Sequence, residues 1–307
     1  MTIRKIAALA AATTLGFSLA ACGSDDPTEA SGAPDSNSSS DTITIGSAAF
    51  PENEIIAEIY AQGLEAKGVK VKKKLNIGAR EVYVKALQNG EIDLVPEYSG
   101  NLLTYFDPEA TATSADEVEE ALDGALPEGL ETLEASAAED KDSLNVTSEF
   151  ATANNLKTIA DLKNVDGLKL GANPEFKTRS YGIPGLEKVY GITGIEFTSL
   201  SDGGGPATLK ALLDGDVDVA DIYSTTPSIV ENDLVTLEDP ENLIAAQNVL
   251  PLINEKKATD EVEDVLDAIS AKLTTQDLLD LNGKNGGDEK TAPATLAKEW
   301  LTAKNLI

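Results

Sequence analysis

The sequence predicts an α/β protein of two lobes, each a mostly parallel sheet flanked by helices. Strand and helix patterns alternate from residue 42 onward, an order typical of parallel sheets covered by helices. Two segments, VYVKALQNGEIDLVPEY and ATLKALLDGDVDVADIY, share a helix, a glycine turn and a short apolar strand that leads to a tyrosine. After residue 250 the chain becomes helical, and we expect these helices to return to the first lobe. The chain would therefore cross between the lobes twice.

The first half of the folded chain alternates between strands and helices. The expected elements are a strand, helix, strand, helix and strand over residues 42–46, 51–68, 69–75, 82–90 and 92–95. Pro51 is tolerated in the first turn of a helix, and Asn89-Gly90 supplies a helix stop. Pro96 is expected to end the third strand, because proline has no N–H to donate to a sheet.

The second half repeats this order. Strands are expected at residues 168–172, 195–200 and 217–223, and helices within 175–191 and 206–213. The later helices place apolar residues at helical spacing over 262–281 and 296–301. The predicted division is 42–144 with 250–307 for the first lobe and 145–249 for the second.

Composition excludes several classes of function. The chain has 307 residues, 41% of them hydrophobic and 25% charged, which is ordinary for a globular protein. Its formal net charge of -29 argues against nucleic acid as a partner, because phosphates would be repelled. There is no histidine, so Ser-His-Asp and Cys-His mechanisms and a histidine metal site are excluded.

The N-terminus predicts export and lipidation. Residues 1–21 combine the basic Arg4 and Lys5 with an alanine-rich apolar run, a pattern typical of a signal peptide. The sequence Leu-Ala-Ala-Cys ending at Cys22 resembles the lipobox of bacterial lipoproteins, in which the cysteine becomes the diacylated N-terminus. Residues 22–41 have no aliphatic side chain larger than alanine and are expected to form a disordered tether.

Both halves place a tyrosine at the carboxyl end of a short apolar strand. Tyr98 follows LVPE, and Tyr223 follows VADI. Ligands bind at this edge in open α/β sheets, so the two rings predict a small-molecule site between the lobes. The alternative is that both segments are ordinary helix–turn–strand units with no binding role.

The folded body resembles the substrate-binding lipoproteins of osmoprotectant (glycine betaine, choline, carnitine) ABC importers. The resemblance covers about Ile43 to Ile307. Its most specific segments are GSAAFPENEIIAEIYAQ from Gly46, LNIGAREVYVKALQNGEIDLVPEYSG from Leu75, PEFKTRSYGIPGLEKVYG from Pro174 and DGGGPATLKALLDGDVDVADIYSTTP from Asp202. It implies a type II periplasmic-binding-protein fold whose two lobes close on ligand by a hinge motion.

The resemblance also implies roles for particular residues. Tyr98 in PEYSG and Tyr223 in DIYST match two tyrosines of an aromatic cage for the quaternary ammonium group. Arg179 in EFKTR matches an arginine that binds the ligand carboxylate, and Glu175 and Phe176 belong to the same motif.

The sequence departs from the family pattern at several positions. Ala48 replaces a lysine that often follows GS, Asn101 replaces a threonine, Asp142 stands at a third cage tyrosine, and Gln247 or Asn248 stands at a fourth. A ligand with hydrogen-bonding groups, such as a primary amine facing Asp142, is therefore an alternative to betaine.

We expect Ser47, Asn101 and Gln247 to supply further polar contacts. Two of the expected roles have alternatives. Arg179 could form a surface ion pair with Glu175 or Glu187, and Asp142 could be one more solvated charge.

The leading hypothesis is a binding protein with no enzymatic activity, no cofactor and no metal. It would be a monomer, lipid-anchored on the extracytoplasmic face of the cell membrane, that delivers a small zwitterionic or cationic osmoprotectant to an ABC permease and its ATPase. One alternative is the same fold binding another small polar amine or an amino-acid-like solute. Others are a sensory or adhesive lipoprotein and an exported carboxylate-based glycosidase.

Overall fold

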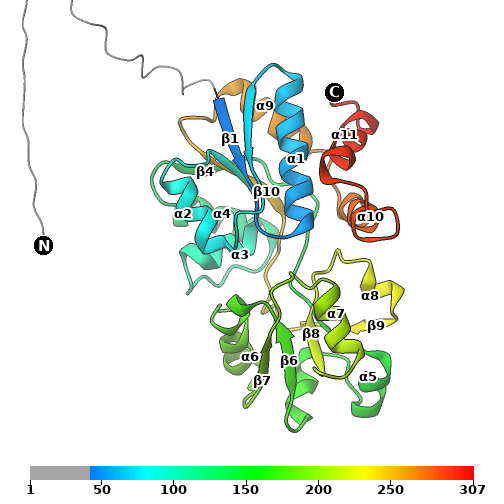
Figure 1. Ribbon diagram of the computed structural model, residues 1–307. Coiled ribbons are helices and arrows are strands. Elements are labelled where there is room, and N and C mark those ends of the chain that lie inside the picture. Colours follow the sequence, from blue (N-terminus) through cyan, green and yellow to red (C-terminus); the bar gives the residue numbers. More distant parts are fainter. Residues whose placement is uncertain (1–41) are drawn as a thin grey trace, which may run out of the picture. The chain divides into compact units, whose positions relative to one another are not determined.

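The structure is a computed structural model that describes residues 42–307 (Figure 1). The predicted signal peptide, the lipidation site Cys22 and the tether to residue 41 lie outside the described residues. Within residues 42–307, no helix is both long enough and apolar enough to cross a membrane.

The first sheet contains five strands in the order β2-β1-β3-β10-β4. Their bounds are β1 Thr42–Gly46, β2 Lys70–Lys74, β3 Leu94–Tyr98, β4 Leu130–Thr132 and β10 Val249–Asn254. β1 is parallel to β2 and to β3, whereas β10 is antiparallel to both of its neighbours. β10 is also the strand by which the chain returns to this sheet from the second one.

Seven helices accompany the first sheet, and we call this whole the first lobe. They are α1 Pro51–Ala66, α2 Arg80–Gln88, α3 Ser99–Phe106, α4 Ala115–Ala125, α9 Asp260–Ser270, α10 Thr275–Gly286 and α11 Pro293–Ala303. The buried helix α1 packs against α9, α10 and α11, so the C-terminal helices cover it (Figure 1). Ile59, Leu266 and Trp300 belong to the shared apolar cluster, which holds α1 in place.

The second sheet has the same construction, with the order β7-β6-β8-β5-β9. Its strands are β5 Leu144–Thr147, β6 Lys169–Ala172, β7 Glu196–Ser199, β8 Val219–Asp221 and β9 Leu234–Thr236. With α5 Ser148–Asn154, α6 Ile183–Tyr190, α7 Pro206–Leu213, α8 Ser228–Glu231 and the short 3₁₀ helices η1 Ile159–Asn164 and η2 Pro174–Lys177, it forms the second lobe. Here β5 is the strand antiparallel to both neighbours.

The predicted α/β architecture with two sheets and two crossings is confirmed. The chain passes from the first sheet to the second between β4 and β5, and it returns between β9 and β10. β3 and β8 occupy corresponding places in the two sheets, as the repeat in the sequence indicates. The residue boundaries predicted for the lobes stay a prediction.

The expectation that Pro96 ends the third strand is wrong. Pro96 lies inside β3, opposite Pro251 of β10. Opposed residues of an antiparallel pair either exchange two hydrogen bonds or none, so two prolines fit a pair that exchanges none. The pairing of β3 with β1 is confined to Leu94 and Ile45, so the missing N–H of Pro96 leaves no ladder bond unmade. The Pro96 carbonyl accepts a hydrogen bond from Asn53 Nδ2 at 3.0 Å.

Candidate ligand site

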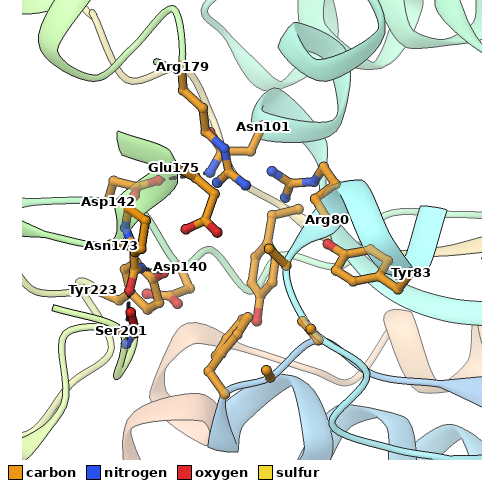
Figure 2. Close-up of a pocket in the computed structure, with 18 residues that line it drawn as sticks. Arg80, Tyr83, Asn101, Asp140, Asp142, Asn173, Glu175, Arg179, Ser201 and Tyr223 are labelled. Atoms are coloured by element: carbon orange, nitrogen blue, oxygen red, sulfur yellow. Dashed lines mark hydrogen bonds between the residues drawn. The ribbon is translucent and has the colours of Figure 1, made fainter. Parts of the chain in front are cut away.

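A cavity of about 210 Å³ lies between the loops at the strand ends of the two lobes (Figure 2). Its lining comes from the loop after β1, the start of α2 and the end of β3 in the first lobe. The second lobe contributes η2 and the loops after β6, β7 and β8. The volume lies below the ~300–1,000 Å³ typical of sites for drug-sized ligands, so the cavity suits a small solute.

Three aromatic rings form one wall of this cavity. The ring of Phe50 lies 6.0 Å from that of Tyr98 and 5.5 Å from that of Tyr223, measured between centroids. The Tyr98 hydroxyl donates to Glu52 at 2.7 Å, and the Tyr223 hydroxyl accepts from Asn173 Nδ2 at 2.7 Å. Phe50, which joins the two tyrosines, is a lining residue that the sequence analysis did not identify.

Arg80 is a second lining residue that was missed, and it is held rigidly. Its Nε and Nη2 donate to the two carboxylate oxygens of Glu97 at 2.8 and 2.9 Å. The carboxylate also accepts from the Tyr83 hydroxyl at 2.7 Å and from the Tyr98 backbone N–H at 3.0 Å. Glu97 is fully buried and Arg80 nearly so, which makes this a bidentate buried ion pair.

Arg179 reaches the same cavity from the second lobe. Its Nη1 donates to the Tyr181 hydroxyl at 2.8 Å, and its Nη2 contacts Glu81 of the first lobe at 3.3 Å. The alternative of an ion pair with Glu175 or Glu187 is therefore not what the structure shows. The pKa of the Arg179 guanidinium is raised overall. Burial lowers this pKa, the neighbouring Tyr181 raises it, and the positive charge of Arg80 lowers it.

The turn that carries Glu175 and Arg179 depends on a glycine. A Cβ on Gly182 would lie 1.8 Å from the backbone carbonyl oxygen of Phe176, which no side chain tolerates. Phe176 is 2% exposed and belongs to the apolar core of the second lobe. The EFKTR motif therefore combines one core residue with two polar side chains directed at the cavity (Figure 2).

Asp142 also lines the cavity and is buried, not solvated. One of its oxygens accepts from Asn101 Nδ2 at 2.8 Å. Asp221 lies beside it, 2% exposed, and its carboxyl oxygens accept no hydrogen bond from any other described residue. Burial, and then the neighbouring Asp142, raise the pKa of the Asp221 carboxyl group.

A second carboxyl pair lies behind the aromatic wall. Glu52 accepts from Thr225 Oγ1 and from Asn282 Nδ2, both at 2.6 Å, in addition to Tyr98. Asp140 accepts from the Thr225 backbone N–H at 3.1 Å. Burial, and then Glu52, raise the pKa of Asp140. This network ties the ring of Tyr98 to residues of both lobes.

Six of the nine sequence-predicted ligand residues line the cavity, and three do not. The six are Tyr98, Asn101, Asp142, Glu175, Arg179 and Tyr223. Ser47 is buried, and its Oγ accepts from the Asn76 backbone N–H at 2.7 Å. Gln247 lies behind Asn101 and exchanges two hydrogen bonds with it, at 2.9 and 2.8 Å. Asn248 donates from Nδ2 to the Ser136 carbonyl.

One signal in the sequence could have found Arg80. Only three arginines occur in the chain, at positions 4, 80 and 179, although lysine is frequent. Both arginines of the described residues line this cavity. The rigid, forked guanidinium group binds carboxylates better than lysine does, so a protein that otherwise uses lysine has a chemical reason to place arginine here.

Two α/β lobes with a small polar cavity between them define a solute-binding protein of the type II periplasmic class. The solved structure of a glycine betaine/carnitine/choline ABC transporter component matches this fold, with a TM-score of 0.67 and 23% identity, over 86% of this chain and 99% of that one. At that identity the match supports the fold alone.

The chain belongs to the family described as the substrate binding domain of ABC-type glycine betaine transport system, whose profile matches residues 41–303. It is 28% identical to the glycine betaine-binding protein YehZ of Escherichia coli (strain K12) over 279 residues, 86% of this chain and 88% of that protein. It is 27% identical to the carnitine transport binding protein OpuCC of Listeria monocytogenes, over 87% and 88% of the two chains.

The predicted resemblance is confirmed. The chain is the substrate-binding component of an osmoprotectant ABC importer, which acts outside the cytoplasm, and its family consists of transport binding proteins and not of enzymes.

Proposed function

We propose that this protein captures a zwitterionic osmoprotectant of the glycine betaine type, with the carboxylate between Arg80 and Arg179 and the ammonium group against the aromatic wall. The two guanidinium groups come from different lobes, so a carboxylate between them would draw the lobes together. Closure of the lobes on the ligand is part of this proposal.

The arrangement of the two arginines is the observation that carries the proposal. Arg80 donates to Glu97 from Nε and Nη2. Its third nitrogen, Nη1, makes no hydrogen bond within residues 42–307 and is available to a ligand. The positive charges of Arg179 and Arg80 repel each other, and a bound anion would offset that repulsion. Figure 2 shows both guanidinium groups directed into the cavity, with Asn101 beside them.

The aromatic wall supplies the second half of the recognition. Ring faces attract an ammonium group that has lost its hydrogen-bond donors, by about 0.5–2 kcal/mol per ring. Tyr98 and Tyr223 come from the two lobes, and Phe50 joins them. Choline and carnitine carry the same trimethylammonium group, so they are the natural competitors of glycine betaine.

Calorimetric titration with glycine betaine and choline tests the placement of the carboxylate. Arg179→Gln should weaken glycine betaine at least tenfold, because a charge-assisted bidentate contact is lost. Choline has no carboxylate and serves as the matched control, so its affinity should change little. Equal losses for both ligands, or no loss for glycine betaine, would remove Arg179 from the carboxylate site.

We further propose that Cys22 is lipidated after cleavage of residues 1–21 and that a tether of residues 22–41 holds a monomeric binding protein at the outer face of the membrane. From there it would deliver its solute to an ABC permease and ATPase. The support is the basic, apolar and cysteine-terminated pattern of the N-terminus. Cys22→Ala should move the protein from the membrane fraction to the soluble fraction, and intact-mass measurement should show loss of the acyl chains.

A further inference from the structure

Among the acidic residues that line the cavity, Glu175 has a carboxylate without a partner in the described part of the chain. It lies on η2, between Arg179 and the side chains around Asn173, and points into the cavity (Figure 2). Within residues 42–307 its carboxylate takes part in no hydrogen bond and no ion pair. Gly182 fixes the backbone turn that carries Glu175, and the Glu175 side chain is half-buried.

The other acids at the cavity already have partners. Asp142 accepts from Asn101 and lies beside Asp221, and Asp140 accepts from the backbone N–H of Thr225. Glu175 is thus the one lining carboxylate with both oxygens available to a ligand among the described residues.

The aromatic wall gives incomplete cover to a trimethylammonium group. Phe50 packs against Tyr98 and, edge to face, against Tyr223, so the rings cover part of one another's surface. The family resemblance implies a third cage tyrosine at position 142, where this chain has Asp142, and Gln247 does not line the cavity. Phe50, Tyr98 and Tyr223 therefore form one wall. The fourth aromatic lining residue, Tyr83, lies apart from them beside Arg80, where its hydroxyl donates to Glu97 (Figure 2).

A bound solute must displace water from Glu175. A trimethylammonium group attracts the carboxylate by charge but offers it no hydrogen, so its oxygens would lose their water partners without replacement. An ammonium group that keeps an N–H can donate a hydrogen bond to the carboxylate in place of the lost water. Such a charge-assisted hydrogen bond is about twice as strong as a neutral one.

We propose that the site selects a small amino-carboxylate zwitterion whose ammonium group still carries at least one N–H, and that Glu175 accepts this hydrogen. The inference rests on the proposed function, since it uses the same cavity and the same carboxylate site. It narrows the solute class to amino acids and partly N-methylated amino acids, with the fully methylated betaine as the weaker ligand.

A methylation series tests this directly. Glycine, sarcosine, N,N-dimethylglycine and glycine betaine share one carboxylate and carry zero to three methyl groups. Calorimetric titration of wild type should give N,N-dimethylglycine at least tenfold higher affinity than glycine betaine. Glu175→Gln should reduce that ratio to threefold or less, chiefly by weakening the N–H ligands. Glu187→Gln, on the exposed face of α6, is the matched control for loss of a negative charge and should leave the ratio unchanged.

Each other outcome has a definite meaning. If glycine betaine is the tightest ligand of wild type, the inference is wrong while the proposed function stands. If Glu175→Gln lowers all affinities equally, Glu175 acts by charge alone and the inference is also wrong. If no member of the series binds, the proposed function fails and the inference fails with it. Unfolding of the ligand-free variant should match wild type, because Glu175 makes no hydrogen bond or ion pair whose loss would cost stability.

Discussion

Arg80 should be essential for stability, because it holds a carboxylate that has no access to water. Arg80→Met removes two of the four hydrogen bonds accepted by Glu97 and leaves its charge buried without a counterion. Breaking one side of a buried ion pair costs about 3–5 kcal/mol, and that is a large fraction of the ~5–15 kcal/mol by which proteins of ordinary stability are folded. We therefore expect a marked fall in the free energy of unfolding.

Urea denaturation monitored by far-UV circular dichroism measures this change in the free energy of unfolding. The variant and the wild type should have the same m-value. A second substitution separates the buried charge from the lost side-chain volume. In the background of Arg80→Met, Glu97→Gln removes the charge; its amide oxygen can accept from the Tyr98 N–H and its amide NH2 can donate to the Tyr83 hydroxyl oxygen, so it should restore more than about 1.5 kcal/mol. Lys210→Met, in an exposed ion pair with Asp214, is the control and should leave the unfolding midpoint unchanged.

Two results would refute this reasoning. A loss below about 1 kcal/mol for Arg80→Met would mean that Glu97 is not deprived of solvation in the way its burial indicates. A double variant no more stable than the single one would mean that lost packing, and not the uncompensated carboxylate, accounts for the effect.

Two further predictions concern residues around the cavity. The raised pKa of Asp221 means that the folded protein holds more protons than the unfolded chain, so stability falls as the pH rises from about 4 through the folded pKa. Asp221→Asn should remove this fall and raise the melting temperature at pH 7.5, whereas the exposed Asp216→Asn should not; an unchanged pH profile would contradict the raised pKa of Asp221. Gln247→Leu removes two hydrogen bonds from Asn101 and should weaken solute binding roughly five- to tenfold without a change in the cavity lining, as titration calorimetry would show. An unchanged affinity would mean that Asn101 needs no support.

Local sequence was sufficient for the elements and for part of the site. The repeat of a helix, glycine turn and strand correctly placed Tyr98 and Tyr223 at corresponding strand ends. The EFKTR motif correctly directed attention to Glu175 and Arg179, which both line the cavity. The tyrosine positions follow from short-range periodicity and from the rule that ligands bind at the carboxyl ends of strands, whereas Glu175 and Arg179 came from the family resemblance.

Long-range contacts could not be read from the same patterns. Ser47 was expected to contact ligand, but its hydroxyl oxygen is taken by a backbone N–H 29 residues away, at Asn76. Asp142 stands in the charged stretch AEDKDS, where solvation is the simple expectation, yet it is 8% exposed because the chain crosses between the lobes there. Each outcome depends on which distant segment is packed beside the residue.

The amino-acid sequence by itself determined the two-lobed α/β class, the exclusion of histidine chemistry and the positions of the strand-end tyrosines, because these depend on composition and on periodicity within a few turns. Only the tertiary structure decided that Phe50 joins those tyrosines, that Arg80 is locked by Glu97, and that Glu175 faces the cavity without a partner. The physical reason is that burial and hydrogen bonding are set by neighbours in space, and at this site those neighbours come from both lobes.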